Sequence, residues 1–167
     1  MKKENKGFTL IELIIVIAIL AITLTVTSDI LISLVRSNNK TRVQNELEQQ
    51  SNFVALKLEK ELRDAGNIIN AGSDELTFTN ENGDEITYLL TGSPSYLQRE
   101  GVPITSPHVP GGVSVTCPSG CFEVLGISPQ RVNISLLFEP VSSGGVLGTS
   151  FSGQVEVNTT VVLRNTY

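Results

Sequence analysis

The sequence predicts an α+β fold in which a long N-terminal α-helix packs on an antiparallel β-sheet head. Residues 8–28 form an apolar run whose only charged side chain is Glu12. Residues 8–65 contain neither proline nor glycine, so no helix breaker interrupts them. After Gly66 the chain changes to short β-rich runs separated by turn residues. One helix followed by a sheet-forming domain is the architecture that these observations favour.

The first part of the predicted helix is long enough to cross a membrane. Its 21 apolar residues would rise roughly 30 Å as an α-helix, which is the thickness of a bilayer's hydrocarbon core. The preceding head carries Lys2, Lys3 and Lys6, which favour retention of that end on the cytoplasmic side. We therefore expect residues 8–35 to form a transmembrane and assembly helix.

From residue 36 to residue 66 the pattern indicates an amphipathic continuation of the helix, with Gly66 as a left-handed helix stop. Polar Gln50 and Ser51 interrupt its apolar stripe near the middle, which argues against a coiled-coil seam. The stripe is therefore expected to lie against the sheet of the head, residues 67–167. Its members are Val43, Leu47, Val54, Leu58, Leu62 and Ala65.

The head contains β-rich runs in the order expected for an antiparallel sheet. A hairpin is predicted around Asn80–Asp84, where Asn82-Gly83 favours a tight turn. The acidic residues of this turn could suggest calcium, but the twelve-residue ligand spacing is absent, and a solvated turn is favoured. Residues 101–112 and 142–153 are expected to be loops. The strands are predicted at 76–79, 86–89, 96–99, 113–116, 122–125, 132–138 and 154–163.

Cys117 and Cys121 are the only cysteines and flank a Pro-Ser-Gly turn. In an exported domain this spacing favours a disulfide, which in so small a loop would stabilise the fold by about 2 kcal/mol. A metal site would need more ligands, and His108 is the only histidine. A redox-active pair usually has two intervening residues and here has three. We predict neither a metal site nor a cofactor.

The residues Gly7-Phe8-Thr9-Leu10-Ile11-Glu12 and the apolar run that follows closely resemble the class III signal of type IV pilins and type II secretion pseudopilins. The resemblance covers about the first 30 residues. It implies that residues 1–7 are a leader peptide and that a prepilin peptidase cuts between Gly7 and Phe8. Phe8 would then become the N-methylated first residue of the mature chain.

The resemblance also gives Glu12 a role in assembly. A carboxylate at this depth is costly in a membrane unless it is paired. The new amine of Phe8 on a neighbouring subunit is a cation that could neutralise it and thereby set the axial register. Asp29 could similarly pair with a neighbour, or it could only mark where the helix leaves the membrane. Both readings of Asp29 stay open at this point.

More loosely, the head resembles the J-type pseudopilins and the W-type minor pilins. The residues concerned are short: Leu62-Arg63-Asp64-Ala65-Gly66, Tyr88 with Tyr96-Leu97-Gln98-Arg99, and the closing Val162-Leu163-Arg164-Asn165. The apolar half has no proline, whereas major pilins commonly carry one there, and this favours a minor subunit. Glu12 disfavours the K-type tip role, because that group lacks the glutamate.

Other classes of protein share part of this pattern. An ordinary signal peptide has a shorter apolar core and an A-x-A cleavage site, which is missing here. A membrane-anchored protein that never polymerises would leave Glu12 without a role. A third hypothesis is that the head is a binding module for a surface, a secreted substrate or DNA.

The net charge and the types of residue present argue against some of these functions. Loss of residues 1–7, with three lysines and one glutamate, changes the side-chain charge from −5 to −7. An acidic head disfavours binding to nucleic acid. No nucleophile–base set or phosphate-binding glycine loop is visible, so we do not expect an enzyme. The expected partners are a prepilin peptidase, other pilins or pseudopilins, and the inner membrane. Before assembly the chain is expected to span that membrane once, with its head outside the cytoplasm.

Overall fold

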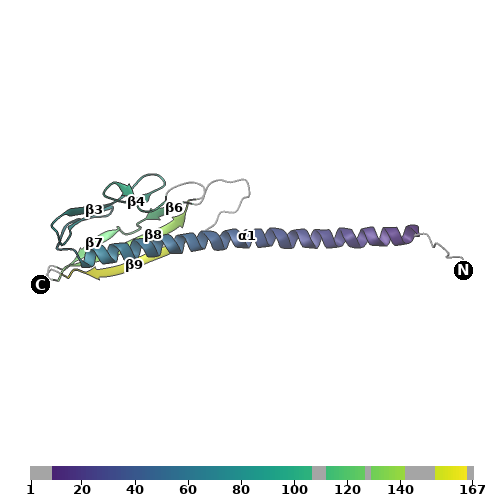
Figure 1. Ribbon diagram of the computed structural model, residues 1–167, viewed down its shortest axis with the longest axis horizontal. Helices are drawn as coiled ribbons and strands as arrows, with labels where there is room; N and C mark the ends of the chain where they lie inside the picture. Colours follow the sequence, from purple (N-terminus) through teal and green to yellow (C-terminus); the bar gives the residue numbers. More distant parts are fainter. Residues whose placement is uncertain (1–8, 107–111, 127–128, 142–152, 165–167) are drawn as a thin grey trace. The chain divides into compact units, whose positions relative to one another are not determined.

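The structure, a computed structural model, describes residues 9–106, 112–126, 129–141 and 153–164 (Figure 1). It confirms the α+β class, with one long helix, α1 (Leu10–Arg63), and antiparallel strands. The chain divides into two compact units, Met1–Thr41 and Arg42–Tyr167. We call the second the head unit, and it includes the part of α1 from Arg42 onward.

The strands of the head unit form two sheets instead of the single sheet that was expected. The first sheet is an antiparallel meander in which each strand pairs with the next. Strands β2, β3 and β4 were predicted. The first and last strands were missed, and the last lies within the predicted loop 101–112. The five strands are β1 (Asn67–Ala71), β2 (Glu75–Thr79), β3 (Glu85–Thr91), β4 (Tyr96–Arg99) and β5 (Val102–Pro103).

The second sheet is built around β8, the strand whose alternating and then apolar sequence predicted a central position. β9 pairs with β8 over residues 131–138, so the other edge of β8 is left for β6 and β7. β6 pairs there with residues 137–140 and β7 with residues 131–134. The four strands are β6 (Val113–Thr116), β7 (Phe122–Leu125), β8 (Arg131–Pro140) and β9 (Val155–Val162).

The core of the head unit lies between α1 and the strands. Every predicted stripe residue from Leu47 to Ala65 is fully buried, and Val43 packs against the same core. Ser51 does not interrupt the stripe, because it is buried and its hydroxyl donates to the carbonyl of Glu48 at 3.1 Å. The largest buried partners from the sheets are Leu76, Phe78, Tyr88, Leu97, Ile134, Leu136 and Phe138.

Gly66 ends the helical region differently from the prediction. It does not adopt a left-handed conformation, which was expected for a helix-capping glycine. Its N–H instead donates to the carbonyl of Thr79 at 2.8 Å, beside the pairing of β1 with β2. The chain therefore passes from α1 into the first sheet with that amide already satisfied.

The hairpin between β2 and β3 is confirmed, with a five-residue connection. Asn80 organises it: its side-chain oxygen accepts from the N–H groups of Asn82 and Asp84, both at 2.9 Å. Gly83 has a φ of 86°, a left-handed conformation that glycine adopts without strain. The turn residues thus satisfy their own backbone, as a solvated turn requires.

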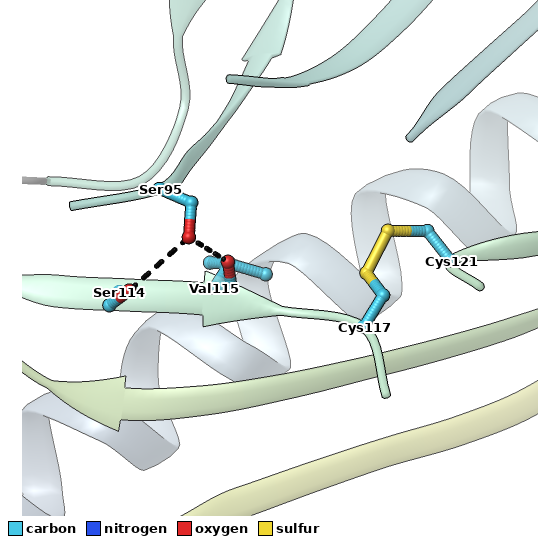
Figure 2. The surroundings of a disulfide bond; sticks show 5 residues. All are labelled: Ser95, Ser114, Val115, Cys117 and Cys121. Carbon is cyan, nitrogen blue, oxygen red and sulfur yellow. Dashed lines mark hydrogen bonds between the residues drawn. A yellow bond between two sulfur atoms is a disulfide. The ribbon is translucent and has the colours of Figure 1, made fainter. Parts of the chain in front are cut away.

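The two sheets meet at a joint made of short polar contacts (Figure 2). The hydroxyl of Ser95 donates to the carbonyl of Val115 at 2.7 Å, and the N–H of Val115 donates to the carbonyl of Ser95 at 2.9 Å. Cys117 and Cys121 form the predicted disulfide in the connection from β6 to β7. The N–H of Cys121 donates to the carbonyl of Ser73, in the connection between β1 and β2, at 2.8 Å, so the disulfide loop also contacts the first sheet's end.

Candidate functional site

The N-terminus of α1 is closed by a reciprocal pair of side chains. The N–H and the hydroxyl of Thr9 donate to Oε2 of Glu12 at 3.1 and 3.2 Å. The N–H of Glu12 lies 3.4 Å from the hydroxyl oxygen of Thr9, which accepts from it. This is a capping box, in which the first and fourth residues satisfy each other's backbone donors. The carboxylate of Glu12 is thereby held at the first turn of the helix.

The capping role of Thr9 was missed from the sequence, although Thr-x-x-Glu before an apolar run is its signal. The negative charge of Glu12 also complements the positive end of the helix dipole. Gly7 and Phe8, the predicted cleavage residues, lie outside the described residues. The structure thus shows how Glu12 is positioned and leaves cleavage between Gly7 and Phe8 as a prediction.

The apolar half of α1 exposes its side chains in every direction. Large hydrophobic residues from Leu10 to Val35 are about half exposed or more, for example 62% at Ile11 and 65% at Ile22. This helix contains a stretch long and apolar enough to cross a membrane, with none of it buried in the chain. A surface of this kind requires lipid or other apolar helices around it.

Four successive hydroxyl groups in this half are satisfied inside the helix. Thr23, Thr25, Thr27 and Ser28 each donate to a backbone carbonyl three or four residues earlier, at 2.6–3.0 Å for the shortest contact of each. Such bonds allow hydroxyl side chains to lie in an apolar environment. Asp29 follows them, and within the described part of the chain its carboxylate has neither an ion-pair nor a hydrogen-bond partner.

In the head unit, the most connected charged side chain is Glu61. It accepts a hydrogen bond from the hydroxyl of Tyr88 at 2.8 Å, and the Nε of Arg99 donates to both of its carboxylate oxygens at 3.0 and 3.1 Å. Lys57 lies 3.9 Å away on the same helix. Glu61 therefore connects α1 to strands β3 and β4.

The contacts of Glu61 shift the pKa values of Tyr88 and Arg99. Burial raises the pKa of the Tyr88 hydroxyl well above its usual value, and the hydrogen bond to Glu61 raises it further. The hydrogen bond to Glu61 also raises the pKa of the Arg99 guanidinium. Tyr88 stacks with Phe78 at a ring-centroid distance of 6.2 Å. We assign this cluster to the stability of the head, because it lies between α1 and the sheet that it joins.

A metal site finds no support in the described part of the chain. Within it no group of three or more His, Cys, Asp or Glu residues could hold a metal ion, and this includes the acidic β2–β3 turn. His108 and most of the predicted loop 142–153 lie outside the described residues.

Comparison with known proteins gives one result. The chain matches the family described as the prokaryotic N-terminal methylation motif over residues 2–28. Neither the curated proteins nor the solved structures gave a significant match. The match covers the capping box and the apolar segment, and it leaves the head unit without a matched family.

Proposed function

We propose that this chain, a type IV pilin-like precursor by its N-terminal methylation motif, is a minor subunit of a type IV pilus or a type II secretion pseudopilus. The motif supports the pilin and pseudopilin family and does not distinguish its subgroups. In this proposal a prepilin peptidase cuts between Gly7 and Phe8 and methylates the new amine. The mature chain then assembles with other pilins or pseudopilins through α1.

One observation carries the assembly role: an exposed apolar helix with its first carboxylate fixed at the first turn. The apolar surface suits lipid before assembly and neighbouring helices after it. Glu12 is held by Thr9 at the end of the helix where Phe8 would begin. A neighbouring subunit that brought its Phe8 amine to this carboxylate would pair the two charges, and the pair would fix the axial register.

The head unit fits a place outside the cytoplasm. Its disulfide is of a kind that persists in oxidising compartments. Lys2, Lys3 and Lys6 favour the cytoplasm for the other end of a single membrane span. The proposed precursor therefore lies in the inner membrane with its head exported, and we expect no catalytic activity from it.

The test is incorporation into filaments when the carboxylate or its support is changed. Glu12→Val should leave cleavage largely intact and reduce incorporation, because no charge remains to meet the neighbouring amine. Thr9→Ala should reduce incorporation less, since the carboxylate remains but loses a hydroxyl donor, and Thr9→Ser should behave as wild type. Cleaved protein and sheared filaments can be quantified by immunoblotting.

Normal incorporation of Glu12→Val would remove the register argument. The alternative function, a membrane-anchored binding module that does not polymerise, predicts that wild-type protein stays in the membrane fraction under all conditions. It also predicts that Glu12→Val and wild type are indistinguishable there.

A further inference from the structure

The part of α1 in the head unit has a second face, opposite to the buried stripe. Phe53 and Leu56 are 52% and 66% exposed on this face, and Lys60 follows one turn later. The spacings of three and four residues place all three on one side of the helix. We call Phe53, Leu56 and Lys60 the outer stripe.

The outer stripe carries one of the few cations of an acidic head unit. Residues 42–167 carry 14 acidic and seven basic side chains, and the stripe places one of these cations beside two large apolar groups. Lys57, at the edge of the stripe, lies 5.8 Å from the centre of the Phe53 ring. Within the described residues the side-chain ammonium of Lys60 makes no ion pair or hydrogen bond. An apolar surface with a free cation calls for a partner with an apolar surface and a free anion.

The apolar half of α1 offers that combination at one place. Ile22, Val26 and Asp29 share one side of the helix by the same kind of spacing, with exposed fractions of 65% and 55% at the two apolar residues. Asp29 is unpaired among the described residues, and the only other charge from residue 8 to residue 35 is Glu12. The outer stripe and the Ile22–Val26–Asp29 side therefore each consist of two apolar residues followed by one charged residue. The two charges are of opposite sign.

We propose that the outer stripe of one subunit binds the Ile22–Val26–Asp29 side of a second copy of this chain, with Asp29 paired to Lys60. The inference rests on the proposed function, because both helices must leave the membrane as parallel members of one assembly. Lys60 follows Asp29 by 31 positions, so the two copies pair in a register offset by 31 residues. In this register Phe53 is level with Ile22, and Leu56 is level with Thr25, one residue before Val26.

The pairing of Glu12 with the Phe8 amine gives Asp29 no role in assembly. The 31-residue register gives it one, as the partner of Lys60. A charge that leaves the membrane interface for a helix bundle is stabilised there only if it is paired. Parallel orientation is required as well, because both copies begin in the same membrane. In the 31-residue register the helices run in the same direction, with the two apolar residues before the charge on each.

The first test is thiol cross-linking between two co-expressed copies, one with Asp29→Cys and the other with Lys60→Cys, in cells that contain the peptidase and assembly machinery. The native cysteines are joined to each other, so the introduced thiols are the reactive ones. We expect the 29–60 pair to give the main dimer. The control is Arg131→Cys, an exposed cation on β8, paired with Asp29→Cys. Equal yields from the two pairs, or a dominant 29–29 product, would overturn the proposal.

The second test is charge exchange. Asp29→Lys and Lys60→Asp should each reduce incorporation severalfold, and one chain that carries both changes should regain most of the loss. Asp29→Asn provides a milder loss if the lysine impairs membrane insertion. Arg131→Asp should incorporate as wild type. Failure of the double variant to improve on either single variant would refute the pair.

These outcomes separate the inference from the function on which it rests. If wild-type chain is cleaved, methylated and incorporated while the 29–60 pair neither cross-links nor responds to charge exchange, only the inference is wrong. If wild-type chain is not cleaved after Gly7 and not incorporated, the proposed function is wrong and the inference falls with it.

Discussion

Glu61 offers the sharpest test of how the helix is held on the head. Its carboxylate, 22% exposed, accepts from Tyr88 and Arg99, which come from two strands of the first sheet. Glu61→Ala removes both charge-assisted contacts and leaves the Tyr88 hydroxyl without that acceptor. Hydrogen bonds to charged groups contribute about 1.5–3 kcal/mol, and we discount these for partial exposure. The expected loss is about 2–3 kcal/mol.

Glu59 is the matched control, two residues away on the same helix. It pairs with Arg63 four residues later, and that arginine is 63% exposed. Exposed pairs of this spacing contribute about 0.5 kcal/mol or less. Urea unfolding of the full chain in detergent can be followed by tyrosine fluorescence, since the chain has no tryptophan. Equal loss of unfolding free energy in Glu59→Ala and Glu61→Ala would refute the structural role of Glu61.

Two further predictions concern the head unit. Burial and Glu61 raise the pKa of Tyr88, so the folded state keeps this proton at a pH where the unfolded chain, with an ordinary pKa near 10, releases it. Its contribution to stability is therefore complete below about pH 10 and is lost as the pH rises further, and Tyr88→Phe should flatten this alkaline decline in urea titrations; an unchanged slope would contradict the assignment. Reduction of Cys117–Cys121 should lower the unfolding free energy by about 2 kcal/mol, measured with and without reductant, and two free thiols in protein from oxidising cells would exclude the bond.

The sequence predicted those parts of the fold that depend on local patterns. The helix and its buried stripe follow from spacing along one element, and the alternation of β8 marked it as a central strand. The division into two sheets was not predictable in this way, because β6 and β7 both pair with β8 and not with each other. Gly66 shows the same limit, since the partner of its amide is Thr79, at the end of the neighbouring strand.

The candidate site shows the same difference between local patterns, which the sequence contains, and long-range contacts, which it does not reveal. Glu12 was found from its place in an apolar run, and the Thr9 cap was available from a four-residue pattern but was not recognised. Glu61 could not be assigned from sequence, because its partners lie 27 and 38 residues away and only the packing of α1 on the first sheet brings them together.

The central claim is that the chain is processed as a prepilin, and the intact mass and N-terminal peptide of protein co-expressed with a prepilin peptidase test it most directly. We expect loss of residues 1–7 and a mature chain that begins at N-methylated Phe8. Gly7→Val should block the cut and retain the full mass, because a side chain at this position obstructs close approach of the peptidase. A wild-type chain that still begins at Met1, or one cut after the apolar segment, would show that the protein is not processed as a prepilin.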